Sequence, residues 1–357
     1  MDTSMSRRTA LRAAGAAAAA AGIGMSTSAA STRGGPPGRA GRIDTHHHAV
    51  PEPMRRWAVD RGLLPPSGGP SWAAWTVPDA VRVMADNRMA AAVVSAPVPS
   101  AAFADPAVAR EGVRVCNEAY AELVADHPTR FGFFAAVAPL HVDLAIEQAA
   151  YALDRLGADG IILMTSAGGR YLGDPAFDPL LAELHRRRAV VLVHPDGLPE
   201  GGTELPGVSE SLADFPLDTT RAALNLIASG TVDRYPGLSI ILSHAGGMLP
   251  YLAGRAESQG RQGEFVDPAR FRRALHRFYY DTALPASPYA MPSLLRAVGA
   301  DRLLYGTDFA SRPAAEVNVI TRDLDRDPAL DGPARRAIDR DNALRLFPRL
   351  ARRLAGR

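Results

Sequence analysis

The sequence contains no lysine, so each of its 40 basic residues is an arginine. A Schiff-base nucleophile, a phosphate-binding Walker motif and a carbamate that bridges two metal ions all need a lysine side chain, and the sequence excludes these sites. Cysteine is almost as scarce, because Cys116 is the only one. It allows neither an internal disulfide nor a thiolate metal cluster. A metal site in this chain is therefore expected to hold a single ion.

The chain also lacks a marked excess of charge of one sign. Its formal net charge is +2, and no stripe of basic residues runs along it, which argues against binding to nucleic acid. The 357 residues, 47% hydrophobic and 22% charged, suffice for one large soluble domain or two ordinary ones. Beyond the N-terminal region no segment approaches the ~18 unbroken apolar residues of a membrane helix. We therefore expect no stable membrane span in the mature chain.

The N-terminal region has the pattern of an export signal. Ser6–Leu11 (SRRTAL) places paired arginines before a weakly apolar, alanine-rich run, and small residues follow near Ala29 and Ala30. This order makes residues 1–30 resemble a twin-arginine signal peptide, and residues 31–42 are predicted to form a flexible linker. We expect export by the twin-arginine route to the periplasm or the cell exterior. The alternative is a disordered or helical alanine-rich start.

Short apolar runs alternate with amphipathic stretches over residues 43–350, which predicts a strand–helix repeat. Such a repeat with eight strands is typical of a (β/α)₈ TIM barrel, and a doubly wound open sheet is the alternative. A long insertion, residues 49–78, follows the first strand, and a second long connection spans residues 195–216; both are candidate lids or binding loops. The predicted strands are Ile43–His46, Ala90–Ala96, Phe131–Ala138, Gly160–Met164, Val190–His194, Leu238–His244, Phe278–Thr282 and Leu303–Thr307.

Histidine and aspartate residues recur where the predicted strands end, which is where a barrel carries its chemistry. These residues are His46, His48, His194, His244 and Asp308. Alternate side chains of a strand share a face, so His46 and His48 are expected to converge while His47 packs elsewhere. Three imidazoles and one carboxylate suit Zn²⁺, with Mn²⁺ or Fe²⁺ as alternatives.

The other side chains around this predicted site have separate roles. His244 is expected to act as general acid/base, or to hold a water molecule, beside the ion. Asp44 is expected to brace the first strand or a ligand histidine. The remaining histidines are predicted to lie at the surface, in helices or loops: His127, His141, His185 and His276.

Six motifs together resemble the amidohydrolase-2 branch of the amidohydrolase superfamily, and the resemblance spans residues 43–348. They are IDTHHHAVP, VLVHP, LSHAGGMLPYLAGR, LLYGTDF, RVCNEAYAELVADHPTRFGFFAAVAPL and GGRYLGDPAFDPLLAEL. Within this branch the chain resembles the 2-amino-3-carboxymuconate-6-semialdehyde decarboxylase family. The stretch from HHHAVPEPM to PSWAAWTVPDAVRVM is most similar to its 6-methylsalicylate decarboxylase-like members.

The resemblance implies a metal-dependent, non-oxidative decarboxylase with a TIM-barrel fold. By position, the implied metal ligands are His46, His48, His194 and Asp308, and His244 is the implied catalytic residue beside them. The expected substrate is an aromatic or unsaturated carboxylic acid, salicylate-like, and His244 or Asp308 is expected to protonate the carbon that loses the carboxylate.

The resemblance also implies how the acid is bound. Arg255 matches an arginine that family members lend to a substrate carboxylate across a dimer interface, which implies a homodimer. Family members use a further arginine from the region after the first motif; Arg55 and Arg56 lie there without matching its position. The export signal is a departure, since the familiar decarboxylases are intracellular.

Two other functions fit the same residues. A metal-dependent hydrolase of a lactone, ester or amide would use the same ligands with a metal-bound hydroxide as nucleophile. A non-catalytic exported protein that binds carboxylates is the third hypothesis. Release of carbon dioxide, simple hydrolysis or binding without turnover would distinguish the three.

Overall fold

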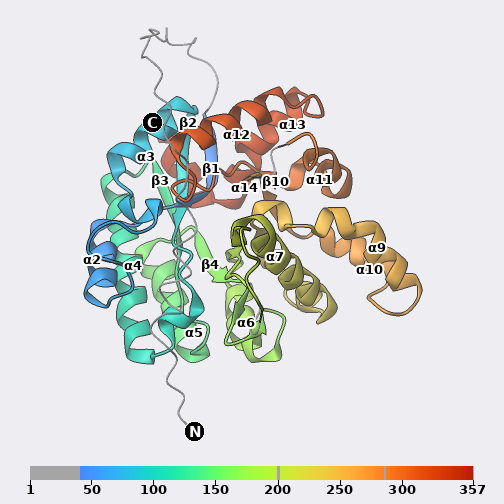
Figure 1. Ribbon diagram of the computed structural model, residues 1–357, viewed down its shortest axis with the longest axis horizontal. Coiled ribbons are helices and arrows are strands. Elements are labelled where there is room, and N and C mark those ends of the chain that lie inside the picture. The colour runs from blue at the N-terminus through green and yellow to red at the C-terminus, as the bar shows by residue number, and fades with distance from the viewer. Residues whose placement is uncertain (1–40, 199–201, 285–286, 357) are drawn as a thin grey trace.

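The computed structural model describes residues 41–198, 202–284 and 287–356, and they form a barrel of eight parallel strands. The strands follow one another around the barrel in chain order (Figure 1). They are β1 (Arg42–His48), β2 (Met89–Ser95), β3 (Phe131–Ala135), β4 (Gly160–Met164), β7 (Val190–His194), β8 (Ser239–Leu242), β9 (Tyr279–Asp281) and β10 (Leu303–Leu304). The two-residue strands β5 (Ser166–Ala167) and β6 (Arg170–Tyr171) form a separate antiparallel pair.

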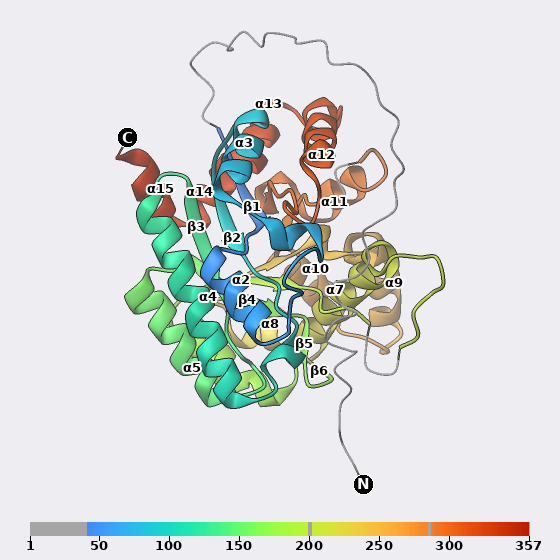
Figure 2. The same cartoon turned by 60° about the vertical axis from the view of Figure 1, so that its left-hand side comes forward.

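The barrel closes between its first strand and the segment that follows its last one. The backbone N–H of Thr45 donates to the carbonyl of Tyr305 at 2.9 Å, and His47 forms a parallel bridge with Phe309. The helices close the same ring, because α12 (Ala314–Arg326) packs against α3 (Val77–Asp86), as Figure 2 shows. The predicted (β/α)₈ barrel is therefore confirmed.

Helices cover the outside of the barrel, with α4 and α5 on one side and α9 and α10 on the other (Figure 1). None of the described helices is both long and apolar enough to cross a membrane. The remaining helices are α2 (Glu52–Asp60), α4 (Pro106–Asp126), α5 (Val142–Tyr151), α6 (Asp178–Arg186), α7 (Glu210–Ala228), α8 (Thr231–Arg234), α9 (Leu249–Arg261), α10 (Pro268–Leu275), α11 (Met291–Val298), α13 (Gly332–Arg336), α14 (Asn342–Leu346) and α15 (Pro348–Ala355).

All eight predicted strands are present, but five of them, namely β2, β3, β8, β9 and β10, end earlier than predicted. β8 ends at Leu242 and β10 at Leu304, so His244 and Asp308 lie beyond the strands. Both residues have left-handed backbones, with φ of 52° and 60°. An extended strand does not contain such angles, and side chains other than glycine rarely adopt them. Strained backbone of this kind is frequent at functional sites.

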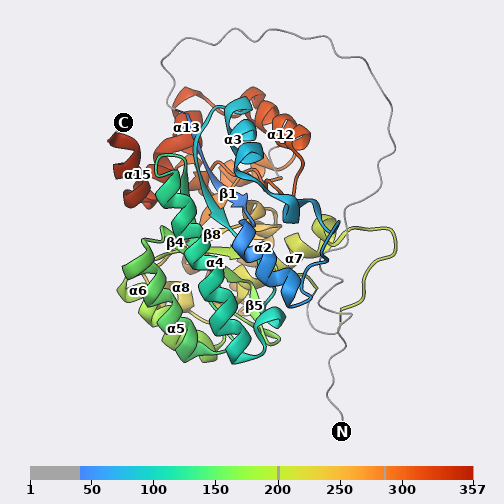
Figure 3. The ribbon, with the colours of Figure 1, turned by 90° about the vertical axis from the view of Figure 1, so that its left-hand side faces the viewer.

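The connection from β1 to β2 contains α2, a short 3₁₀ turn (Ser71–Ala74) and α3. α2 lies alongside α4 (Figure 3). Close contact is possible because α4 carries Gly112, where a Cβ atom would lie 2.4 Å from the ring of Trp57. The second long connection is shorter than predicted, since α7 already begins at Glu210 and contains Pro216.

The predicted linker ends one residue too late, because Arg42 is the first residue of β1. Its side chain is buried, donates to Asp339 at 2.8 Å and to Asp325, and lies over the ring of Tyr305. A buried arginine needs such partners, and they are far away in sequence. The predicted signal peptide and the rest of the linker lie outside the described residues.

Candidate metal centre

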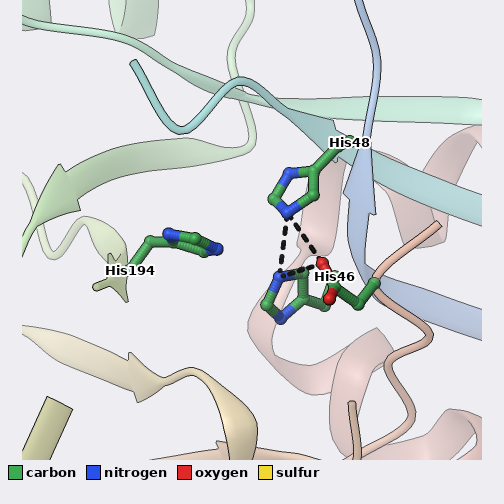
Figure 4. Close-up of side chains that lie close together, drawn as sticks. His46, His48 and His194 are labelled. Carbon is green, nitrogen blue, oxygen red and sulfur yellow. Dashed lines mark hydrogen bonds and ion pairs between the residues drawn. The ribbon is translucent and has the colours of Figure 1, made fainter. Parts of the chain in front are cut away.

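The four predicted metal ligands meet at the carboxyl ends of two parallel strands, β1 and β7, and the segment after β10. One ligand atom from each of His46, His48, His194 and Asp308 lies within 4.8 Å of all the others, and all four residues are buried. Figure 4 shows the rings of His46 and His48 side by side, with His194 facing them from another strand. The two Nε2 atoms are 3.2 Å apart. Two nitrogens bound tetrahedrally to one ion at ~2.0–2.1 Å would be about as far apart.

The outer nitrogen of each ligand histidine has its own partner. Nδ1 of His46 lies 2.8 Å from the carboxylate of Asp281, and Nδ1 of His194 lies 2.9 Å from the carbonyl of Pro195. Nδ1 of His48 lies 3.4 Å from the hydroxyl of Ser95. A proton on Nδ1 leaves Nε2 with a free lone pair that points inward, which is the arrangement that metal-binding histidines use. The donor set therefore fits one divalent ion.

The charges of the site follow from burial and from the carboxylates around it. Burial opposes protonation of His46, but the charge of Asp281 and its hydrogen bond outweigh it and raise the pKa of His46 to about 9. Burial and the neighbouring imidazoles hold the pKa of His194 well below its usual value. Burial opposes ionisation of Asp308, yet its interactions with the nearby imidazoles of His244 and His48 keep its pKa well below the usual range. A cation is the natural partner for this anionic, histidine-lined pocket.

His244 lies beside this ligand set. Its Nε2 is 3.9 Å from Oδ2 of Asp308, and its ring centroid is 4.9 Å from that of His46. Its Nδ1 is buried and has no hydrogen-bond partner among the described residues. The ring is therefore close to the ion position without being needed as a ligand, which suits a group that transfers a proton.

Asp281, at the end of β9, was missed by the sequence analysis. Its Oδ2 pairs with Nδ1 of His46, and its Oδ1 accepts the backbone N–H of His244 at 2.9 Å. One carboxylate thus orients a ligand histidine and holds the strained turn of His244. Asp281 ends β9, the seventh strand of the barrel, just as Asp308 follows β10, the eighth. Its position at the end of the YYD run was the signal that could have marked it as a site residue.

Asp44 braces the first strand, as predicted. Its carboxylate accepts from the backbone of His46 and of Thr307, each at 3.1 Å, and lies 3.1 Å from Nδ1 of His47. His47 turns away from the ligands and packs against the ring of Phe309, with ring centroids 5.0 Å apart. Its predicted packing role agrees with this position.

A second carboxylate that the sequence analysis missed supports the loop after β7. Asp218 of α7 is buried and accepts from the backbone N–H of Asp196 at 2.9 Å, from Tyr171 at 2.9 Å and from Thr165. Asp196 follows His194 by two residues, so α7 anchors the segment that carries a ligand. No motif in the sequence marks this contact, since it joins side chains far apart in the chain.

The structure does not bring Arg255 into the site of its own chain. It lies exposed on α9, one turn after Tyr251, whose exposed fraction is 82%. Arg55 and Arg56 of α2 pair with Glu52. The four histidines predicted to lie at the surface stay outside the cluster, but of these only His276 is exposed. The other three are half-buried, namely His127, His141 and His185.

The chain is similar in sequence to a known protein family and to several decarboxylases. The amidohydrolase family model matches residues 43–349. The 6-methylsalicylic acid decarboxylase of Aspergillus aculeatus is 36% identical over 330 residues, covering 87% of this chain and 97% of its own. That of Penicillium expansum is 35% identical over 325 residues, with the same coverage of 87% and 97%. The gamma-resorcylate decarboxylase of a Polaromonas strain is 28% identical, covering 64% and 75%.

Solved structures share the fold. An amidohydrolase II crystal structure has a TM-score of 0.76 at 27% identity, covering 86% of this chain and 99% of its own. A dihydroxybenzoic acid decarboxylase from Polaromonas, with bound manganese, has a TM-score of 0.71 at 23% identity, covering 87% and 97%. The family match over most of the barrel, together with the extensive identity to named relatives, shows that the chain belongs to the amidohydrolase family.

Proposed function

We propose that this chain is a metal-dependent, non-oxidative decarboxylase of an aromatic carboxylic acid, a carboxy-lyase. The observation that carries the proposal is the convergence of His46, His48, His194 and Asp308, with His244 beside them, in a chain 36% identical to a 6-methylsalicylic acid decarboxylase. A salicylate-like acid, with a hydroxyl ortho to the carboxylate, is the substrate class that we infer from those relatives.

In the proposed reaction the ring carbon that bears the carboxylate is protonated, and carbon dioxide leaves as the electrons of the broken bond return to the ring. A bound divalent ion would polarise the carboxylate and hydroxyl oxygens of the substrate. His244 supplies the proton from Nε2, and Oδ2 of Asp308, 3.9 Å away, stabilises the imidazolium form before the transfer. Asp281 fixes the position of the His244 backbone during these steps.

For the ion we propose Zn²⁺, with Mn²⁺ or Fe²⁺ as alternatives. Three histidines and one carboxylate are typical zinc ligands, and they also suit the other two ions. The direct test of the function is to supply the purified protein with each ion in turn and add 2-hydroxybenzoates and their esters. Carbon dioxide release supports a decarboxylase, whereas ester cleavage alone would favour the hydrolase hypothesis and contradict the proposal.

We also propose that two chains form a homodimer in which Arg255 reaches the partner's site. Exposed apolar side chains lie on α7, on and just before α9, and just before α11. Both α7 and α11 pack against α9. Tyr251 and Arg255 share a face of α9, since residues four apart do so. An exposed apolar surface of this kind often marks a protein interface. The exposed side chains are Leu212, Leu217, Met248, Tyr251 and Tyr289.

The expected result for Arg255→Ala is a large loss of acid turnover with the metal content unchanged, because the change removes a two-pronged carboxylate contact. Co-expression with His244→Ala chains tests the arrangement. A mixed dimer then has one site with both defects and one intact site, so about a quarter of wild-type activity is expected from random pairing. Mixed dimers that recover no activity would place Arg255 outside the partner's site.

We further propose that the protein is exported by the twin-arginine route to the periplasm or the cell exterior. The basis is the arginine pair Arg7 and Arg8 ahead of the alanine-rich run. Replacing both by lysine is expected to retain the protein in the cytoplasm, measured by cell fractionation. Arg33→Lys, in the predicted linker, is the matched control and should be exported. Normal export of the double variant would contradict the proposal.

A further inference from the structure

Among the residues that the structure describes, Arg312 is the arginine whose side chain forms an ion pair with a residue of the ligand cluster, Asp308. Arg312 lies in the connection between β10 and α12, and its backbone N–H donates to the carbonyl of Asp308 at 2.9 Å. This single turn folds the side chain back, so Nε lies 3.4 Å from Oδ2 of Asp308. The side chain is 29% exposed, so it lies between the cluster and solvent.

The two oxygens of Asp308 face different groups. Oδ1 lies 3.0 Å from Nε2 of His48 and 3.5 Å from Nε2 of His46, on the side of the ion position. Oδ2 lies near Nε2 of His244 and Nε of Arg312. Arg312 therefore lies on the same side of Asp308 as His244, the proposed proton donor, and away from the ligand histidines. The reacting group of a substrate would lie on this side.

The guanidinium of Arg312 has hydrogen-bonding capacity that the protein does not use. Its Nε is buried and forms no hydrogen bond, because the approach to Asp308 lacks the required geometry. Its terminal nitrogens donate to no atom of residues 41–198, 202–284 and 287–356. A guanidinium has five N–H donors, and a carboxylate can accept two of them in parallel.

The other candidate arginines of the same chain do not have this position. Arg55 and Arg56 pair with Glu52, and their side chains are 37% and 67% exposed. Arg255 is exposed on α9. Of these four described arginines, Arg312 is the one that lies beside the ligand cluster.

We propose that Arg312 binds the carboxylate of the acid substrate within its own subunit and holds it against His244. This inference rests on the proposed function, from which we take that the substrate is an aromatic carboxylic acid. The partly desolvated position strengthens a charge-assisted hydrogen bond. Loss of one such bond corresponds to a roughly 10- to 100-fold weaker affinity.

The test is a calorimetric titration of the metal-loaded protein with 2-hydroxybenzoate, and with phenol as the ligand that lacks a carboxylate. Arg312→Gln is expected to raise the Kd of 2-hydroxybenzoate by roughly 10- to 100-fold and to leave phenol binding and metal content unchanged. Arg312→Lys should recover part of the affinity, since it keeps the charge without the planar fork. Arg322→Gln, on the exposed side of α12, is the matched control and should bind as wild type.

Several outcomes would overturn the inference. Equal weakening of both ligands, or loss of metal, would mean that Arg312 only positions Asp308. Unchanged affinity for 2-hydroxybenzoate in Arg312→Gln would exclude the contact even if the wild type releases carbon dioxide. Binding that depends on Arg312 without carbon dioxide release would support the contact and contradict the decarboxylase. A wild type that binds no 2-hydroxybenzoate would overturn both.

Co-expression tests the own-subunit part of the inference. His244→Ala and Arg312→Gln chains are expected to show no recovery of activity when mixed, because both defects then inactivate the site of their own chain. Recovery to about a quarter of wild-type activity would instead place Arg312 across the interface.

Discussion

Replacing His46 and His194 together by alanine is expected to remove the bound metal and to abolish decarboxylation. The two residues come from β1 and β7, and their ring centroids are 5.3 Å apart. The remaining pair, His48 and Asp308, supplies two ligands, fewer than the three protein ligands that catalytic zinc sites use. Turnover should fall by at least the ~10²–10³-fold that follows loss of one preorganised electrostatic contact, since the whole charge centre is lost.

Elemental analysis of protein purified without chelator measures this effect. The wild type is expected to contain about one ion per chain. The control is a double variant that removes two histidines outside the cluster, His127→Ala with His276→Ala, and it should keep both metal and activity. Full metal content in the His46, His194 double variant, or two ions in the wild type, would contradict the single-site assignment.

The second large effect is expected at His244. Replacing it with asparagine should lower kcat by roughly 10²–10⁴-fold, the usual contribution of a positioned general acid/base. Asparagine is the informative substitution, because it tolerates the left-handed φ of 52° better than alanine does. The metal content should stay near one ion per chain, because Nε2 of His244 is outside the ligand set.

Steady-state kinetics and metal analysis on the same samples separate this role from a structural one. His244→Ala should lower kcat by a similar factor. A lower thermal stability of this variant would indicate the additional backbone strain of alanine at this position. His276→Asn, an exposed histidine on another element, is the matched control. Turnover of His244→Asn near the wild-type value would exclude proton transfer by this residue.

The sequence predicted the barrel because its strongest signals are local. Runs such as Gly160–Met164 and Val190–His194 are apolar over the whole length of the strand and are bounded by helical repeats, and both strands have the predicted limits. In a barrel of parallel strands the carboxyl ends meet at one face, so residues at those ends converge. That rule was sufficient to bring His46, His48, His194 and Asp308 together before their distances were known.

The sequence could not predict which partners hold these side chains. Asp281 pairs with a histidine 235 residues earlier, and Asp218 supports the loop after β7 from a helix. Neither contact has a periodicity or a motif, since it depends on how strands and helices pack. The left-handed turns at His244 and Asp308 also depend on surrounding contacts that compensate their strain.

The sequence by itself determined the absence of lysine chemistry, the strand–helix repeat and the candidate residues at the strand ends, because composition, period and spacing are properties of the chain alone. Only the tertiary structure decided that Arg312, and not Arg55 or Arg56, lies beside Asp308. Arginine is long and flexible, so its place in the sequence does not fix where its charge lies. The turn that reverses the chain after Asp308 does fix it, and this turn begins in the segment that pairs with β1 where the barrel closes.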